Sequence, residues 1–332
     1  MMSDNQHFTC PDCDDVSRRD FVKVAGGAAI AAGALPLLAT PRTLQAAPTE
    51  KSTAETTVKR LYDTLSDEQR KAICMPYDHQ KRKTLNANWL ITDQKIGSDF
   101  YTDEQRKIID TIVRDVSSED GYERFKRQMA ADQSGGFGDY SIAVFGTPGS
   151  GKFEWVLTGR HLTLRADGDS VKNMAFGGPI AYGHGASDPA KNLFHYQTKK
   201  ANEVFQALDT KQREQALLPK APPEARVPIR GEGAKFPGVA VSELASDQKE
   251  LVEQVIKVML APYRQEDVDE VSAVLKAGGG LEKLHMAFYE QGDLETDNVW
   301  DIWRVEGPTF VWHFRGAPHV HTYVNIGLEQ PI

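Results

Sequence analysis

Three histidines stand close together near the C-terminal end of the 332-residue sequence, in the segment WHFRGAPHVHTY. On a β-strand, His319 and His321 point to the same face, because alternate side chains share a face. The short Gly-Ala-Pro link predicts that the strand bearing His313 is the antiparallel neighbour, which brings His313 to the same pair. Neutral imidazoles suit zinc, copper or ferrous iron. The sequence therefore predicts a transition-metal site at these three residues; the alternative is that they are surface residues or hydrogen-bonding partners of nearby Asp, Glu or Tyr.

A fourth histidine, His161, lies in the segment GRHLTL. Its surroundings are rich in β-branched and aromatic residues and predict a strand. We expect His161 either to be a further metal ligand or to act as a catalytic base beside the ion.

Asp78 and Arg82 form a second candidate site, in the segment YDHQKR. On a helix, side chains at i and i+4 are neighbours, so the two residues either form an ion pair or present a bidentate grip for an anion. Pro76 just before them fits a loop or a first turn, and we favour the internal ion pair. Cys74 and His79 suggest a thiol nucleophile with its base, but the sequence offers no third group, so a buried structural thiol is the preferred interpretation.

The run from Gly146 to Lys152 has the spacing of a phosphate-binding loop. Such a loop needs Ser or Thr after the lysine to bind magnesium, and a helix whose N-terminus faces the phosphates. Here Phe153 follows the lysine, and the segment FEWVLTGRHLTL predicts a strand. We therefore expect a hairpin turn shaped by Pro148 and the glycines, and no ATP as a cofactor.

The N-terminal segment is typical of a twin-arginine export signal. Arg18 and Arg19 precede an apolar run at 24–39 that is rich in Gly and Ala and shorter than the ~20 residues that span a bilayer. We expect residues 1–47 to be a cleaved signal peptide, residues 48–58 to be a polar tether, and the mature protein to be periplasmic or otherwise extracytoplasmic. The twin-arginine export machinery is then a partner. The alternative is an uncleaved signal that anchors the protein in the membrane.

Composition limits the class of protein. The formal net charge of −8 at pH 7 argues against a general attraction for nucleic acid or anionic lipid. A hydrophobic content of 40% is enough to build a core. Of the three cysteines, one remains after signal cleavage, so the mature protein has no internal disulfide. Twin-arginine export moves folded proteins, which fits a cofactor that is inserted before export.

Four related phrases predict helix starts: LSDEQRKAI, YTDEQRKII, LDTKQREQAL and LASDQKELV. In the first three, a Ser, Thr or Asp stands three residues before Gln, the reciprocal arrangement of a capping box. In the fourth, we expect Ser246 to be the cap, with Lys249 in the third position. The spacing of the four phrases is irregular, which favours shared start chemistry over a solenoid repeat.

Strand-forming segments lie on both sides of these helices. Residues 139–146 and 152–166 are rich in β-branched and aromatic residues, and four such segments follow one another from Leu284 on. We expect an α+β fold, in which an antiparallel sheet with a C-terminal β-meander packs against several helices. Residues 59–332 are expected to form a single domain with a Pro-rich loop at 219–238.

The segment FGTPGSGKFEWVLTGRHLTL resembles the family named domain of unknown function 3500. The segments YDHQKR, SSEDGYERF and HVHTYVN resemble other family segments in the same order, so the resemblance covers roughly Leu61 to Gly327. The sequence departs from the family pattern at Arg160, where a second histidine usually precedes His161, and at His313, where a carboxylate is frequent. The family has no assigned activity, so the resemblance implies an organisation rather than a reaction.

Two functions from different classes remain open. The first is an exported metal-dependent enzyme, hydrolytic or oxidative, in which His313, His319 and His321 hold the ion and His161 lies near it. The second is a non-catalytic extracytoplasmic protein that binds a small molecule or a partner through the Pro-rich loop and the aromatic residues after Trp300.

Overall fold

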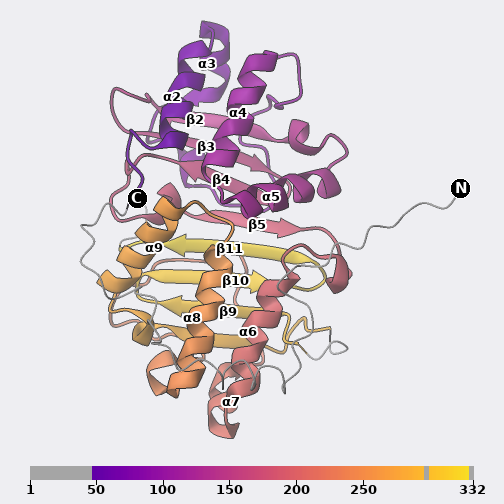
Figure 1. Cartoon of the computed structure of the whole chain (residues 1–332), viewed down its shortest axis with the longest axis vertical. Helices are drawn as coiled ribbons and strands as arrows, with labels where there is room; N and C mark the ends of the chain where they lie inside the picture. The colour runs from indigo at the N-terminus through magenta and orange to yellow at the C-terminus, as the bar shows by residue number, and fades with distance from the viewer. Residues whose placement is uncertain (1–46, 295–298, 329–332) are drawn as a thin grey trace, which may run out of the picture. The chain divides into compact units, whose positions relative to one another are not determined.

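One mostly antiparallel sheet organises the protein (Figure 1). The structure is a computed structural model that describes residues 47–294 and 299–328. The proposed export residues Arg18 and Arg19 lie outside the described residues. The strands are β1 (Cys74–Met75), β2 (Ser141–Gly146), β3 (Phe153–Gly159), β4 (Leu162–Ala166), β5 (Ile180–His184), β6 (Leu217–Leu218), β7 (Val239–Ala240), β8 (His285–Tyr289), β9 (Ile302–Gly307), β10 (Phe310–Arg315) and β11 (Val320–Ile326). Their order in the sheet is β1-β2-β3-β4-β5-β11-β10-β9-β8-β6, and β7 also pairs with β8.

Helices alternate with these strands along the chain. They are α2 (Thr53–Thr64), α3 (Asp67–Ile73), α4 (Asp103–Asp115), α5 (Glu119–Asp132), α6 (His195–Ala207), α7 (Thr210–Ala216), α8 (Ser246–Leu260) and α9 (Gln265–Ala277). The strands β8, β9, β10 and β11 are consecutive antiparallel neighbours. The expected α+β fold with a C-terminal β-meander is therefore confirmed.

The helices lie on one face of the sheet (Figure 1). Val320 and Val324 of β11 belong to the large hydrophobic core that the helices share with the sheet. Tyr323, between them, points to the opposite face and packs in one cluster with Ala87 and Val227. These two residues come from the long segments that follow β1 and β6, so loops rather than helices cover the second face.

Three of the four predicted helix starts are confirmed as capping boxes, at α3, α4 and α7. The expectation that Ser246 caps α8 is wrong by one residue. Ala245 is the N-cap residue, and its backbone N–H donates to Oε1 of Gln248 at 2.9 Å. The helix starts there because the side chain of Gln248, and not that of Lys249, accepts a hydrogen bond from the backbone N–H of the cap residue.

The four starts form two equivalent pairs. The side-chain amide of Gln69 donates to Gln105 at 2.9 Å and that of Gln212 donates to Gln248 at 3.1 Å, over a separation of 36 residues in both pairs. Gln105 and Gln248 each donate to a backbone carbonyl 41 residues earlier, at 3.1 and 2.8 Å. Gln69 and Gln212 each donate to a carbonyl 31 residues later, at 2.6 and 3.4 Å. Such a match of contacts and spacings indicates a repeat.

The order of elements repeats in the same way. The series α2, α3, β1, α4, α5 and the four strands β2 to β5 is followed by α6, α7, β6, α8, α9 and the four strands β8 to β11, with β7 as an addition (Figure 1). The two halves of the sheet join where β5 pairs antiparallel with β11. The four helix-start phrases therefore belong to two similar halves side by side, a repeat that their irregular spacing in the sequence concealed.

The expected hairpin turn is confirmed. The strands β2 and β3 are antiparallel neighbours, with Gly146 opposite Phe153. Gly146 has a φ of +71°, which an L side chain rarely adopts. Lys152 consequently leads into β3 rather than into a helix, unlike the lysine of a phosphate-binding loop.

The expected tether at 48–58 is wrong from Thr53 onward. The helix α2 begins there, and its Ala54 and Val58 are fully buried. The segment looks polar in the sequence because only one narrow stripe of α2 reaches the core.

Candidate metal centre

The first histidine of the candidate centre, His161, lies in the turn between β3 and β4, with a φ of +58°. Its Nδ1 lies 2.6 Å from Oδ2 of Asp132, the last residue of α5, and both side chains are 3% exposed. A carboxylate only accepts hydrogen bonds, so Nδ1 carries the proton and the lone pair of Nε2 is free to bind a metal.

His319 and His321 come from the β10–β11 hairpin of the other half of the chain, and their Nε2 atoms lie 3.0 Å apart. Nδ1 of His321 lies 2.9 Å from Oε1 of Glu224, which belongs to the Pro-rich loop. The second oxygen of Glu224 accepts from Nε of Arg315. His321 thus repeats the arrangement of His161, with a carboxylate behind Nδ1, and its Nε2 faces Nε2 of His319.

Strand register explains why His161 and His321 meet. Leu162, directly after His161, pairs with Tyr182 of β5. His321 pairs with Gly183, the next residue of β5. Gly183 therefore lies between the two histidines across the sheet. Because Gly183 has no side chain, the rings of His161 and His321 approach each other over it, and their centroids are 4.8 Å apart. A Cβ atom on this glycine would lie 2.1 Å from a backbone oxygen of β11.

The three side chains form a group with the dimensions of a metal site. One candidate ligand atom from each of His161, His319 and His321 lies within 4.8 Å of the others. In a tetrahedral zinc site with Zn–N bonds of about 2.0–2.1 Å, two ligand nitrogens are about 3.3 Å apart. The 3.0 Å between Nε2 of His319 and Nε2 of His321 is close to that separation.

Electrostatics keep this group ready to bind a cation. Burial, followed by the charges of His321 and His161, lowers the pKa of His319 to about 4. Burial also lowers the pKa of His321, although its hydrogen bond to Glu224 opposes the change. Burial raises the pKa of Glu224, but its contacts with His321 and Arg315 outweigh this and lower it to about 2. Neutral imidazoles backed by charged carboxylates are the protonation states that metal binding requires.

His313, a ligand expected from the sequence, is not brought to this group. It lies opposite Tyr323, further along β11 from the hairpin turn than His321, and is 1% exposed. Its Nδ1 accepts from Nε of Arg304 at 3.3 Å, and burial, followed by the charge of Arg304, lowers its pKa to about 3. The structure places His161, from the other half of the chain, where the sequence suggested His313.

The expected ion pair between Asp78 and Arg82 is not found among the described residues. Gln80–Lys83 is a 3-10 helix, which has three residues per turn, so i and i+4 do not align as on an α-helix. Nη1 of Arg82 lies 3.1 Å from Oε2 of Glu154, and Arg165 pairs with the other oxygen of that carboxylate. Asp78 is exposed.

The remaining sequence candidates are structural. Burial raises the pKa of Cys74 to about 11, which leaves the thiol protonated and unreactive. Tyr323 is buried on the face that the loops cover, and four other large aromatic side chains after Trp300 are fully buried in the core under the helices: Trp303, Phe310, Trp312 and Phe314. They form the sheet core rather than the lining of a cleft.

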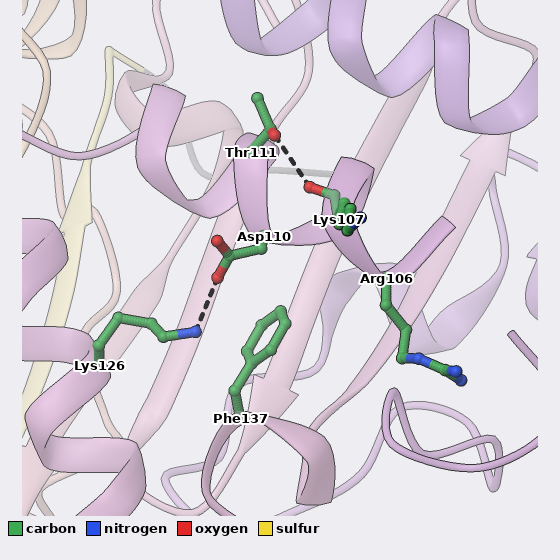
Figure 2. Close-up of a pocket in the computed structure, with 6 residues that line it drawn as sticks. All are labelled: Arg106, Lys107, Asp110, Thr111, Lys126 and Phe137. Atoms are coloured by element: carbon green, nitrogen blue, oxygen red, sulfur yellow. Dashed lines mark hydrogen bonds and ion pairs between the residues drawn. The ribbon is translucent and has the colours of Figure 1, made fainter. Parts of the chain in front are cut away.

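A surface pocket between α4 and α5 contains none of the predicted site residues (Figure 2). Nζ of Lys126 lies 2.7 Å from Oδ1 of Asp110, and Arg106 pairs with Asp103 at 2.6 Å. These basic groups are already balanced by carboxylates. The pocket is lined by Arg106, Lys107, Asp110, Thr111, Lys126 and Phe137.

Sequence reasoning missed Asp132 and Glu224. Asp132 stands at the end of a helix, in AADQSGG, and Glu224 stands in the Pro-rich loop, in PPEAR. With 47 acidic residues in the chain, neither position carries a local signal of its own. The sequence predicts a loop in the Pro-rich segment, but it does not indicate which side chain of that loop faces the sheet.

Comparison with known proteins gives a family and no activity. The family described as "Protein of unknown function (DUF3500)" matches residues 47–325. No curated protein and no solved structure matches the chain. Within residues 47–294 and 299–328, no helix combines the length and apolar character needed to cross a membrane.

Proposed function

The chain belongs to the DUF3500 family, and we propose that it is a metal-dependent enzyme whose ion is bound by His161, His319 and His321. One observation carries the proposal: His161 and His321 each have a carboxylate behind Nδ1, and His319 converges on them, with one candidate ligand atom of each histidine within 4.8 Å of the others. Carboxylate–histidine–metal arrangements of this kind fix the tautomer and raise the basicity of the ligand.

Zinc is the ion that this donor set favours. Three neutral imidazoles with no thiolate match the protein ligands of catalytic zinc sites, which keep one position for water or substrate. A divalent ion there supplies Lewis acidity and lowers the pKa of water, which suits hydrolysis. Copper or iron in the same imidazole set supports oxidation instead, so the metal found decides between the two reaction types.

The residues around the ligands have separate tasks. Asp132 holds His161 and is itself held by the backbone N–H of Gly185, which donates to Oδ1 at 2.8 Å. Glu224 holds His321 and is balanced by Arg315. The two carboxylates orient the imidazoles and keep Nε2 of each ring deprotonated for the metal.

Elemental analysis of protein purified from a host that exports it tests the proposal. We expect about one zinc, copper or iron ion per chain, and its loss in His319→Ala and His161→Ala. Hydrolysis of p-nitrophenyl acetate and p-nitrophenyl phosphate by the zinc-loaded protein, compared with His319→Ala, tests the hydrolytic step. The proposal is contradicted if the wild-type protein contains no transition metal after purification from the exporting host and also binds none when zinc is added.

The alternative function is a non-catalytic binding protein. Stoichiometric metal without turnover of any ester or oxidisable substrate would favour it. The buried aromatic residues give it less support than their density in the sequence suggested, because Trp303 and Trp312 are 0% exposed.

We also propose that the protein is exported through the twin-arginine machinery and works outside the cytoplasm. The support is the sequence of residues 17–47, with its paired Arg18 and Arg19 before an apolar run. Cell fractionation of an Arg18→Lys/Arg19→Lys double variant is the test: we expect it to stay in the cytoplasm, and unchanged export would refute the route.

A further inference from the structure

We infer that the metal centre acts on a small carboxylate anion, which the guanidinium of Arg160 binds beside the ion. This inference rests on the proposed function and names the class of its substrate. Arg160 precedes His161 in the turn between β3 and β4, so the two side chains are carried by the same short segment.

Arg160 has no protein partner for its charge within the described residues. It is half-buried, and its Nε is buried without a hydrogen-bond partner. Its backbone carbonyl is held firmly, because Nε2 of Gln128 donates to it at 2.9 Å and the hydroxyl of Tyr140 donates to it at 2.5 Å. The turn is thus fixed, while no group among the described residues accepts a hydrogen bond from Nε of Arg160.

The guanidinium lies next to the candidate centre. The point where a Cβ atom on Gly185 would lie is 2.7 Å from Oδ1 of Asp132, 3.4 Å from Cε1 of His161 and 3.6 Å from Nη2 of Arg160. Arg160 also contributes to the low pKa of His319 through its charge. A ligand that enters beside Gly185 therefore meets both the arginine and the histidine group.

The nearby carboxylates are already engaged. Oδ1 of Asp132 accepts from the backbone N–H of Gly185, and Oδ2 accepts from His161 and Gln128. Glu224 is shared by His321 and Arg315. With a divalent ion in place, the charge of the ion and of Arg160 exceeds that of Asp132, because Glu224 and Arg315 cancel. The excess positive charge favours an anionic ligand.

The shape of the donor favours a carboxylate. Nε and Nη2 form one edge of the guanidinium, and two parallel N–H groups on such an edge match the two oxygens of a carboxylate. Phosphate can use the same edge, so the two anions must be compared directly.

Cobalt provides the readout. The protein is loaded with Co²⁺, whose visible absorption reports both metal binding and changes at its open position, and is titrated with acetate, inorganic phosphate and neutral acetamide. In Arg160→Gln we expect the Kd for acetate to rise about 10- to 100-fold, the range of a lost charge-assisted hydrogen bond. The Kd values for Co²⁺ and acetamide should not change. Arg160→Lys, which keeps the charge and loses the fork, should give an intermediate Kd.

The control is Arg60→Gln, which removes the same charge from an exposed position of α2. Equal acetate affinity in Arg160→Gln and Arg60→Gln overturns the inference while leaving the metal centre intact. An Arg160-dependent affinity for phosphate but not for acetate overturns the carboxylate assignment. Failure of the wild-type protein to bind Co²⁺ at all refutes the proposed function instead.

Discussion

His161 holds the most constrained backbone conformation of the three histidines. Its φ of +58° lies in the left-handed region, which costs a non-glycine residue about 1–3 kcal/mol and persists only where the surroundings enforce it. Its backbone N–H donates to the carbonyl of Ala87 at 2.5 Å, and its ring is fixed by Asp132. Strain of this kind at a convergent polar group is typical of functional sites, and here it brings the ring of His161 to centroid distances of 5.0 and 4.8 Å from those of His319 and His321.

The carboxylates behind the histidines should tune metal affinity. Asp132→Asn and Glu224→Gln keep the size of each side chain but remove the charge that orients its imidazole. We expect each variant to bind Zn²⁺ about 10- to 100-fold more weakly, as measured by competition with a fluorescent chelator. Asp110→Asn, which removes a carboxylate paired with Lys126 on the surface, is the matched control and should bind like the wild type. Unchanged affinity in both Asp132→Asn and Glu224→Gln would show that the two carboxylates do not support a metal.

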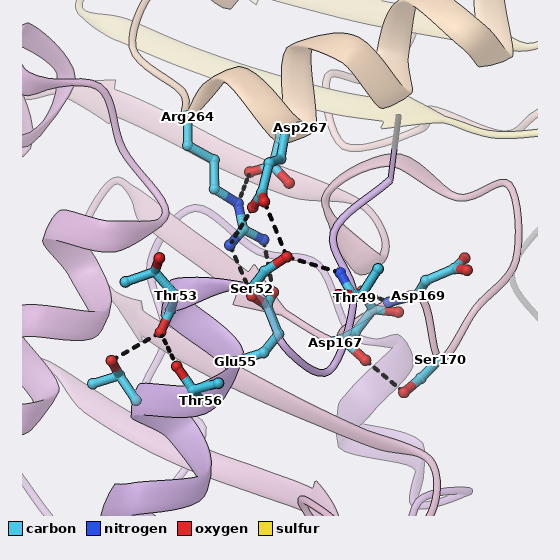
Figure 3. A network of polar contacts seen from close by, with 12 residues as sticks. Thr49, Ser52, Thr53, Glu55, Thr56, Asp167, Asp169, Ser170, Arg264 and Asp267 are labelled. Carbon is cyan, nitrogen blue, oxygen red and sulfur yellow. Dashed lines mark hydrogen bonds and ion pairs between the residues drawn. The ribbon is translucent and has the colours of Figure 1, made fainter. Parts of the chain in front are cut away.

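A second polar group contains several buried carboxylates around Arg264. Arg264 donates to both oxygens of Glu55, at 2.9 and 2.7 Å, and to Asp267 at 3.1 Å (Figure 3). Burial raises the pKa of Asp167 to about 8 and that of Asp267 to about 7. One arginine therefore does not neutralise all the acids buried around it.

Glu270 should make stability depend on pH. Burial, then the charges of Asp167, Asp267 and Asp169, raise its pKa to about 9, against a small opposite effect of Arg264. Between its ordinary pKa of about 4.3 and about 9, the folded chain keeps a proton that the unfolded chain has lost, so stability falls as pH rises, by up to about 1.4 kcal/mol per pH unit for one proton.

Glu270→Gln should remove this contribution and flatten the fall. Urea unfolding at pH 5, 6, 7 and 8 measures the slopes of wild type and variant. Glu250→Gln, on the exposed side of α8, is the control. Parallel pH profiles for the wild type and Glu270→Gln would mean that Glu270 ionises normally in the folded protein.

At the level of elements, the paired capping glutamines connect three helices in each half: α2, α3 and α4 in the first, and α6, α7 and α8 in the second. Gln105 and Gln248 are 3% and 7% exposed, and each joins a helix start to the end of an earlier helix. Replacing either by alanine leaves buried backbone groups without partners, so we expect each variant to lose about 1–3 kcal/mol of unfolding free energy. Because the contacts match, the two losses should be similar.

Chemical denaturation compares these variants with Gln254→Ala, an exposed position of α8 that should change stability by less than about 0.5 kcal/mol. Losses in Gln105→Ala and Gln248→Ala no larger than in this control would contradict a structural role for the pairs.

Elements were predictable where local chemistry decides them. Capping residues such as Thr102 and Asp209 mark their helices directly, and Phe153 after Lys152 distinguishes a strand from a phosphate-binding helix. The helix α2 was missed because its buried stripe is narrow. The twofold repeat was missed because it is carried by side-chain contacts such as that between Gln212 and Gln248, which no single phrase contains.

Only part of the site was predictable, because its residues are far apart in the sequence and are brought together by long-range strand pairing. The pair His319 and His321 was expected from the two-residue period of a strand, but only His321 lies on β11, and His319 lies in the bend just before it. The choice between His313 and His161 depends on β5 pairing with β11, a long-range contact that residue spacing does not encode. Glu224 depends in turn on how the Pro-rich loop crosses the sheet.

For the molecule as a whole, the candidate centre spans the boundary between two similar halves. His161 and Asp132 belong to the first half, and His319 and His321 to the second. The halves are joined here by β5 and β11, so an ion bound by all three histidines cross-links them through the sheet. The fold thus explains why the ligands come from distant parts of the chain.

Metal binding should therefore stabilise the whole protein against unfolding. At a free Zn²⁺ concentration of about 100 times Kd, mass action adds about 2.7 kcal/mol to the unfolding free energy, provided the unfolded chain does not bind the ion. Thermal unfolding with Zn²⁺ and with EDTA measures this increment. We expect His161→Ala and His319→Ala to lose it to the same extent, because each removes one ligand from a different half.

His313→Gln separates the two possible ligand sets. Its midpoint in EDTA should fall, because His313 is buried against Arg304, but the increment from Zn²⁺ should remain, since the residue does not belong to the convergent group. Loss of the increment in His313→Gln together with its persistence in His161→Ala would return the metal to the C-terminal hairpin alone, and the ion would no longer cross-link the halves.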